Sequence, residues 1–395
     1  MRGWKQILDG RSRTAEPNSK TATPDVCAGC LEDAALAAWI RESPRARACS
    51  YCREADMVRS LDELARRVLD GVESEWGAPA VEPSERFVGL TVDTETLLLE
   101  IVDPITSVAA LEHDLVAFLP RMHWRARNPW PVTLDEDRDV WSHFAEELRH
   151  ERRFFLHLSP EDEATQHAIG YTELLAEVTN GLRTCKLLRR LARGARIHRM
   201  RVSKTGKRFT RASELGPPRF EIDRQPNRVS PCGRPMLHAA FDARGAAGAT
   251  YEPRYEAAMA SLATFRTRRE LLLLDLTKLP NTPSLYDPEH RGERPYLAFL
   301  RTYAEELAKP IVRGQDEQIG YVPTQVVTNY LRHHLADVNG HAIDGIVHAN
   351  QRVPTSPTCV LFARNRDCGE RGAQTLLELE RVKHKALAPR TMVVG

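Results

Sequence analysis

The sequence predicts an α+β protein in which a mainly helical N-terminal half precedes a mixed α+β domain. Apolar residues recur at helical spacing over residues 58–76 and 92–120, as on the buried faces of amphipathic helices. From residue 197 onward, short apolar runs alternate with turn residues and further helical stretches, which is the pattern of a mixed domain. Two Cys-x2-Cys pairs lie before residue 58 and indicate a metal-binding segment.

Length and composition narrow the class of protein. At 395 residues the chain exceeds a usual single domain, and its 42% hydrophobic content is enough to form cores. A net charge of +2 predicts no bulk attraction to nucleic acid or to a membrane surface. No apolar run is long enough to span a bilayer, and residues 1–5 lack the apolar core of a signal peptide. We therefore expect a cytoplasmic protein without a membrane partner.

The first segment, residues 1–57, is predicted to be a flexible start followed by a zinc-binding segment. Residues 1–24 are polar and have little to bury. The cysteines that follow form two tight pairs on either side of a helix-like stretch, Cys27, Cys30, Cys49 and Cys52. Four thiolates at this spacing complete a tetrahedron around Zn²⁺ and leave no open position, so the expected role is structural. The alternative is four unrelated buried thiols.

Residues 58–190 are predicted to form a mainly helical domain. A polar, proline-containing break at 77–86 separates the first two helical stretches. The stretch 181–194 has leucines between its basic residues and is predicted to be an amphipathic linker helix ending at Gly194. The basic run over residues 183–211 usually marks a solvated face. A nucleic-acid surface is the alternative, but no aromatic side chains interleave with the charges.

Residues 191–395 are predicted to form the mixed α+β domain. We expect helices at 254–266, 296–308, 324–335 and within 370–395, and strands at 271–276, 344–348 and 358–363. The chain has no phosphate-loop or dinucleotide-fold glycine fingerprint.

The stretch from Arg199 to Glu252 is the candidate site. Guanidinium groups match phosphate geometry bidentately, and arginines stand both on an expected strand and before a Pro-Cys-Gly turn. A single carboxylate, Glu252, is a common partner for a sugar carbon that develops positive charge. Because arginine is abundant in this chain, these residue types alone are also compatible with an ordinary surface.

This stretch and several blocks after it resemble the RES domain, an NAD-degrading toxin module named for its Arg, Glu and Ser. The resemblance covers about half of the chain and assigns residues 191–395 to a RES domain. The resembling blocks, in order, are Arg199-Met200-Arg201-Val202, Asn227-Arg228-Val229-Ser230-Pro231-Cys232-Gly233, Leu274-Asp275-Leu276-Thr277, Tyr321-Val322-Pro323-Thr324-Gln325, Asp344-Gly345-Ile346 and Cys359-Val360-Leu361-Phe362.

The resemblance implies a fold like that of ADP-ribosyltransferases and cleavage of the nicotinamide–ribose bond of NAD. The acceptor would be water, phosphate or a protein, corresponding to hydrolysis, phosphorolysis or ADP-ribosyl transfer, and the sequence does not decide among them. By position in the family pattern, the residues implied to bind NAD are Arg199, Arg201, Arg228 and His238, and those implied in catalysis are Glu252, Arg199 and Asn350.

Three of these positions depart from the family pattern. His238 replaces a tyrosine, and a longer spacing leads from it to Glu252, which makes Glu256 the second candidate for the acid. Asn350 replaces the family serine and can replace its hydrogen bond but not a hydroxyl nucleophile. These departures leave open a second hypothesis, a catalytically degenerate nucleotide-binding or sensor protein on the RES scaffold.

Residues 58–185, with the cysteine pairs before them, resemble the HEPN-like domain that precedes some RES domains. HEPN ribonucleases use an Arg-x4-6-His motif, and two pairs fit it, Arg138 with His143 and Arg152 with His157. A chain this rich in arginine gives about that many pairs by chance, so a HEPN-type ribonuclease is a third hypothesis. RES toxins are usually paired with a helix-turn-helix (Xre-type) antitoxin, which is the implied partner of a toxin or defence effector. The oligomeric state stays open.

Overall fold

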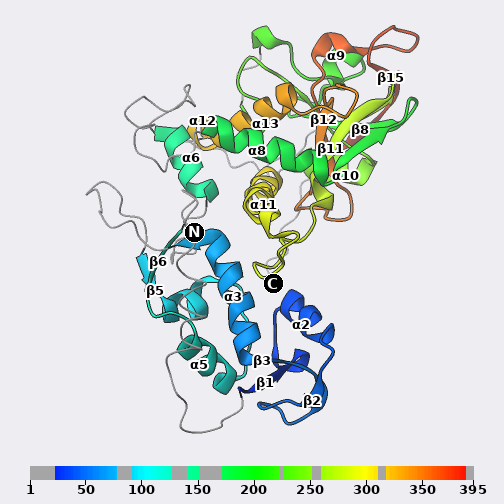
Figure 1. Cartoon of the computed structure of the whole chain (residues 1–395). Helices are drawn as coiled ribbons and strands as arrows, with labels where there is room; N and C mark the ends of the chain where they lie inside the picture. The colour runs from blue at the N-terminus through cyan, green and yellow to red at the C-terminus, as the bar shows by residue number, and fades with distance from the viewer. Residues whose placement is uncertain are drawn as a thin grey trace, which may run out of the picture. The chain divides into compact units, whose positions relative to one another are not determined.

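The structure is a computed structural model that describes residues 23–77, 91–126, 140–150, 171–222, 226–250, 259–309 and 317–387 (Figure 1). The chain divides into two compact units. The N-terminal unit comprises Met1–Arg127 and Ser284–Arg291, and the C-terminal unit comprises Asn128–Pro283 and Gly292–Gly395. Among the described residues, no helix is long and apolar enough to cross a membrane.

The N-terminal unit combines helices with two small antiparallel sheets. Its helical elements are η1 (Ala28–Cys30), α2 (Ala34–Arg41), α3 (Leu61–Glu75), α4 (Thr94–Thr96), the π-helical turn η2 (Leu97–Ile101) and α5 (Ala109–Phe118). One sheet has the order β1 (Asp25–Cys27), β3 (Ala55–Ser60), β2 (Ala46–Ala48), and the other β4 (Trp76–Gly77), β6 (His123–Ala126), β5 (Thr91–Asp93). The predicted helical character is therefore accompanied by strands in the described residues.

Helix α3 is the central element of this unit, and its sequence explains where it begins. Ser60 caps the helix: its side chain accepts a hydrogen bond from the N–H of Glu63, at 3.3 Å, and the Glu63 carboxylate accepts one from the N–H of Ser60, at 3.0 Å. The apolar stripe predicted from its spacing is buried, at Leu61, Leu64, Ala65, Val68, Leu69 and Val72. The stripe shares one core with the cysteine segment, so residues 23–57 are not a separate domain.

A short segment from much later in the chain completes this core. Leu285 and Tyr286 are fully buried within it, and the Tyr286 hydroxyl donates to the carbonyl of Asp103 at 3.3 Å. Helix α3 carries a glycine where the ring lies, because a Cβ on Gly71 would be 2.7 Å from Cδ1 of Tyr286. Residues 284–291 thus fold with the N-terminal unit, although their sequence position assigns them to the 191–395 domain.

The C-terminal unit is built on a nine-stranded mixed sheet. In spatial order its strands are β14 (Cys368–Gly369), β15 (Leu377–Ala386), β10 (Met259–Thr267), β8 (Arg196–Ser203), β9 (Leu237–Ala240), β13 (Thr358–Leu361), β12 (Gly345–His348), β11 (Leu271–Asp275) and β7 (Leu188–Leu191). The β11–β12 and β14–β15 pairs are parallel, and the other pairs are antiparallel.

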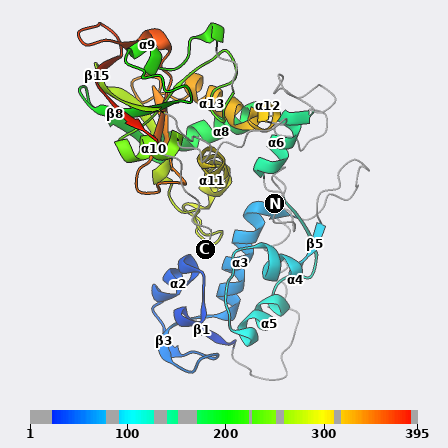
Figure 2. The ribbon, with the colours of Figure 1, turned by 180° about the vertical axis from the view of Figure 1, so that it is seen from behind.

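Helices accompany this sheet. They are α6 (Val140–His150), α8 (Tyr171–Thr184), α9 (Ala212–Leu215), η3 (Phe220–Ile222), α10 (Ala243–Thr250), η4 (Leu276–Lys278), η5 (Arg291–Glu293), α11 (Arg294–Ala308), α12 (Glu317–Gly320), α13 (Val322–His334) and η6 (Asn365–Asp367). Figure 2 shows α8, α11 and α13 close to one another, and their buried side chains form one core with those of α6.

Strand β11 shows how the sheet is buried on both faces. Leu272 and Leu274 belong to the core that contains α6, α8, α11 and α13, whereas Leu271 and Leu273 belong to the core on the other face. A strand enclosed on both sides reads as an uninterrupted apolar run, which is why this strand was predictable from sequence. The helices predicted at 296–308 and 324–335 and the strands predicted at 344–348 and 358–363 are also confirmed, as α11, α13, β12 and β13.

Three predicted helices are strands instead. The linker helix expected to end at Gly194 gives way after α8 to strand β7, whose residues pair with β11. The helix expected at 254–266 is wrong over its described part, because β10 lies there between β8 and β15. The helix expected in the tail is strand β15, paired with β10 along its length. In each case pairing with distant strands overrides a local helical pattern.

The units also differ from the predicted domain limits at 57 and 190. Helices α6 and α8 contribute Trp141, Phe144, Leu175 and Val178 to the core that includes β11 and β12 of the large sheet. They therefore belong to the C-terminal unit rather than to a separate helical domain.

Replacing Tyr286 tests whether the inserted segment stabilises the N-terminal unit. Tyr286→Ala removes a fully buried ring, and we expect the free energy of unfolding of that unit to fall by about 3–5 kcal/mol. Hydrogen exchange of the α3 amides in urea measures the loss. Glu289→Ala changes an exposed side chain of the same segment and should stay within about 0.5 kcal/mol of the unmodified chain. Equal exchange in all three proteins would refute the role of Tyr286.

Candidate functional site

A pocket of about 450 Å³ lies in the C-terminal unit, between β8, β9, α10, the end of α11 and the loop after β12. Its volume is within the range typical of ligand sites. Five cationic side chains line it: Arg199 and Arg201 of β8, Arg228 of the segment before β9, Lys309 at the end of α11 and Arg352 of the loop after β12. No Asp or Glu is among the described residues that line it. The pocket therefore favours an anionic ligand.

The pocket opens where β8 and β9 separate. One residue pair, His198 with Ala240, joins these two strands. Beyond it the Arg199 guanidinium donates to the carbonyl oxygen of His238 at 2.8 Å, which is a hydrogen bond that the strand ladder does not supply. Nε of Arg199 is buried without a partner among the described residues. Burial lowers the pKa of Arg199 to about 10, so the group stays charged at neutral pH.

His238 lines the pocket from β9 as a neutral imidazole. Its Nε2 is buried and has no hydrogen-bond partner among the described residues. Burial, followed by the charges of Arg199 and His348, lowers the pKa of His238 to about 3. Burial also lowers the pKa of His348, to about 4, and Nδ1 of His348 lies 2.9 Å from the carbonyl oxygen of Ala349. The imidazoles of His238 and His348 are therefore both uncharged in the pocket at neutral pH.

Arg228 is held in place by several groups. Its Nη1 lies 3.3 Å from the Glu306 carboxylate and its Nε donates to the carbonyl of Lys309 at 3.2 Å. Its guanidinium also lies over the ring of Tyr321, 5.0 Å from the centroid. These contacts fix the direction of the cation before any ligand binds.

Arg201 occupies a more exposed part of the pocket. Its guanidinium stacks on Phe209, 4.2 Å from the ring centroid, and donates to the carbonyl of Glu214. It is thereby oriented, although solvent reaches it.

Asn350 lines the pocket, but its amide bonds mainly to the protein. Asn350 is only 5% exposed. Its Oδ1 accepts hydrogen bonds from the N–H groups of Arg352, at 3.2 Å, and Val353, at 3.3 Å. Its Nδ2 donates to the carbonyl of Gly245 in α10 at 3.2 Å.

The structure thus brings Arg199, Arg201, Arg228, His238 and Asn350 to one pocket. The candidate acids Glu252 and Glu256 lie outside the described residues, as do Arg138, Arg152, His157 and the side chain of His143. Thr250, the last residue of α10, lines the pocket.

The pocket residues that were missed in the sequence include Lys309, His348 and Arg352. Lys309 and Arg352 follow the ends of a helix and a strand, where sequence spacing carries little information about direction. His348 could have been found, because it stands on the strand that leads to Asn350.

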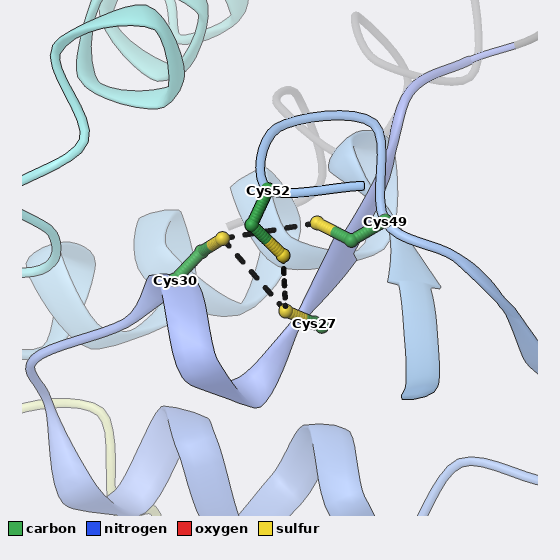
Figure 3. A group of neighbouring side chains, drawn as sticks. All are labelled: Cys27, Cys30, Cys49 and Cys52. Atoms are coloured by element: carbon green, nitrogen blue, oxygen red, sulfur yellow. Dashed lines mark hydrogen bonds between the residues drawn. The ribbon is translucent and has the colours of Figure 1, made fainter. Parts of the chain in front are cut away.

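The four predicted zinc ligands come together in the N-terminal unit (Figure 3). The sulfurs of Cys27 and Cys30 are 3.7 Å apart, those of Cys27 and Cys52 3.5 Å, and those of Cys30 and Cys49 3.8 Å. A tetrahedron with zinc–sulfur bonds of about 2.3 Å has edges of about 3.8 Å. The geometry therefore fits a four-cysteine zinc site, and this part of the sequence prediction is confirmed as a cluster that could hold zinc.

The surroundings of the cluster explain why a cation is favourable there. Three of the cysteines are buried. Burial raises the pKa of Cys27 to about 11 and also raises that of Cys30, whereas at Cys49 burial is outweighed by backbone hydrogen bonds, which lower the pKa to about 7. Thiols at these sulfur–sulfur distances stabilise one another little, whereas a divalent cation would bind all four as thiolates. Thr106 of the same unit donates to the carbonyl of Cys30 at 2.6 Å and ties the cluster to the rest of the core.

Comparison with known proteins gives one family. The family model for HEPN/RES N-terminal domain 1 matches residues 42–162, which includes the second cysteine pair. The match supports a RES-associated N-terminal domain over these residues. No curated protein matches the chain, and no solved structure matches it.

Metal analysis tests the cysteine cluster. We expect one zinc ion per chain purified without chelator, and loss of that zinc in Cys27→Ser and in Cys49→Ser, because three thiolates leave a tetrahedral site open. Cys232→Ser, which changes an exposed cysteine of the C-terminal unit, should keep the zinc. A zinc content near zero in the unmodified chain would contradict the site.

The neutral state of His238 predicts an acid-dependent stability. The imidazole has a pKa of about 3 when folded and an ordinary value of 6.5, so the unfolded chain takes up the proton first. Its contribution to stability is therefore present above pH 6.5 and is lost as the pH falls toward 3. Between about pH 7.5 and 5, the unmodified C-terminal unit should lose about 1–2 kcal/mol more than His238→Gln.

Urea unfolding at the two pH values, followed by hydrogen exchange in the large sheet, measures this difference. His113→Gln changes an exposed histidine and should behave like the unmodified chain. If His238→Gln lost the same stability as the unmodified chain on acidification, the imidazole would not be buried in its neutral form.

Proposed function

We propose that the chain is a RES-type enzyme that consumes NAD by cleaving the nicotinamide–ribose bond. The observation that carries the proposal is the convergence of Arg199 and Arg228, from separate resembling blocks, and of His238, at the position of the family tyrosine, on one cationic pocket that no described acid lines. The match of residues 42–162 to a domain named for its place before RES domains adds support. The RES identity of the C-terminal unit and its likeness to ADP-ribosyltransferases are part of the proposal.

The pocket offers what the pyrophosphate of NAD needs. Arg228 is preoriented by Glu306 and Tyr321, and Arg199 presents a buried donor without a partner among the described residues. A guanidinium aimed in advance at two phosphates binds them with little loss of side-chain entropy. A neutral His238 could donate to or accept from the carboxamide of nicotinamide without repelling its pyridinium charge.

Bond cleavage needs one group more. The C1′–N bond breaks with its electron pair going to nicotinamide, and the ribose carbon becomes cationic until an acceptor oxygen attacks it and loses its proton. Cations that bind the pyrophosphate equally throughout do not lower this barrier, whereas a carboxylate near C1′ does. We assign this carboxylate to Glu252. Along the chain it stands two residues after Thr250, which lines the pocket.

The proposal extends to the setting of the enzyme. A NAD-consuming protein would act in the cytoplasm as a toxin or defence effector, and a helix-turn-helix antitoxin that covers the pocket would restrain it. Asn350 lines the pocket, but the hydrogen bonds of its amide to the protein favour a structural role over contact with the reacting atoms.

An NAD assay tests the function. We expect the purified chain to remove NAD and release nicotinamide, and Glu252→Gln to slow this by on the order of 10²–10³-fold while NAD binding survives. Glu221→Gln changes an exposed carboxylate of the same unit and should keep full activity. ADP-ribose, its phosphate ester or a modified protein as product would identify the acceptor.

The outcomes separate the hypotheses. Full activity in Glu252→Gln would show that Glu252 is not the catalytic carboxylate, and Glu256 would then be the candidate. No NAD consumption by the unmodified chain would reject the enzyme, and binding of NAD without turnover would then support the nucleotide-binding protein. RNA cleavage that disappears in His143→Ala would support the ribonuclease instead.

A further inference from the structure

Helix α10 is a thin partition between two cavities of the C-terminal unit. It lines the candidate pocket with Ala246, Gly248 and Thr250. A second cavity of about 690 Å³ is lined by Ala243, Ala247 and Gly248 of the same helix, so Gly248 borders both cavities. The position of this helix therefore sets the shape of the candidate pocket.

Burial alone holds α10 weakly. Its sequence over Ala243–Thr250 contains no large apolar side chain, and its buried residues are Gly245 and Ala246. Such small groups contribute little apolar area. Their size instead permits a close approach, because a Cβ on Gly248 would be 2.4 Å from Cγ2 of Val353. Hydrogen bonds therefore contribute to fixing the helix, and one of them runs from the Thr250 hydroxyl to the carbonyl of Met200 in β8 at 3.3 Å.

Asn350 supplies one attachment. Its Nδ2 donates to the carbonyl of Gly245 in the helix at 3.2 Å. Its Oδ1 accepts from the N–H groups of Arg352 and Val353 and so fixes the turn after β12. The two ends of one buried amide thus connect α10 to the loop after β12, which also lines the pocket.

Ser356 supplies the second attachment. Its hydroxyl donates to Oδ2 of Asp242 at 2.7 Å, and Oδ1 of Asp242 accepts from the N–H of Gly245 at 2.7 Å. Asp242 immediately precedes the helix, so this bond holds its first turn. Ser356 is not among the residues that line the pocket.

We infer that Asn350 is a positioning residue, which acts with Ser356 to clamp α10 as the wall of the pocket. The inference rests on the proposed function for the reaction that the wall serves, but the clamp itself is a feature of the fold. An amide is required at this position, since one side chain must both donate to the helix and accept from the loop. A serine has a single, shorter polar atom and cannot make both attachments.

Substitutions separate the two ends of the amide. Asn350→Asp keeps the acceptor for the loop but loses the donor to Gly245 and places a negative charge against that carbonyl. Ser356→Ala removes the second attachment without touching the pocket. Thr355→Ala changes an exposed hydroxyl of the same loop and is the matched control.

Hydrogen exchange of the full chain and NAD kinetics test the clamp together. We expect Asn350→Asp and Ser356→Ala each to lower the protection of the α10 amides about 10-fold, the effect of one buried hydrogen bond, with the sheet unchanged. Both should raise KM for NAD by a similar factor. Because the attachments share one helix, the double variant should be non-additive. Thr355→Ala should change neither quantity.

Two results would overturn the inference. One is unchanged α10 protection in Asn350→Asp together with a kcat reduced about 100-fold or more, since Asn350 would then act on the substrate directly. The other is unchanged protection in Ser356→Ala. If the unmodified chain consumes no NAD, the proposed function fails, but the exchange of α10 still decides whether Asn350 and Ser356 form a clamp.

Discussion

The separation of β8 from β9 after a single residue pair is the constraint on which the pocket depends. A continued ladder would fill this space with backbone hydrogen bonds, and no ligand could enter between the strands. Arg199 spans the start of the gap by donating to the carbonyl of His238. The same side chain therefore satisfies a backbone acceptor and presents a buried charge. The sheet stays continuous elsewhere because its central strands are enclosed on both faces.

Gathering several cations in one partly buried pocket is unfavourable in free energy, and neighbouring groups of the fold offset part of that unfavourable term. Arg228 is paired with Glu306, whose carboxylate does not line the pocket, so the charge is stabilised without an acid entering the site. Burial keeps His238 and His348 uncharged and spares the pocket two further cations. What remains is a site with oriented donors, which suits a polyanion better than a simple surface patch of arginines does.

Elements whose structure depends on local sequence could be predicted, whereas elements that depend on contacts with distant parts of the chain could not. Strand β11 could be predicted because its buried leucines identify it without reference to any neighbour. Strands β7 and β10 could not, since Leu188 and Leu191 also fit a helical repeat and the Ala-rich β10 is a strand only between β8 and β15. The cysteine cluster was visible because metal ligands come in fixed local spacings. The arginines of the pocket were found through ordered family blocks, whereas Lys309 and Arg352 reach it from element ends that tertiary packing alone directs.

The burial of Tyr286 against Gly71 has a consequence for how such a protein can evolve. The N-terminal core contains a piece of chain encoded far downstream, so a single recombination event cannot transfer the zinc-bearing unit intact to another protein. A gene fragment ending near residue 127 would lose the ring that fills the core, and one beginning there would carry a tyrosine with no core to enter. The two units are therefore expected to be inherited together, and substitutions at Gly71 and Tyr286 should covary among descendants of this chain.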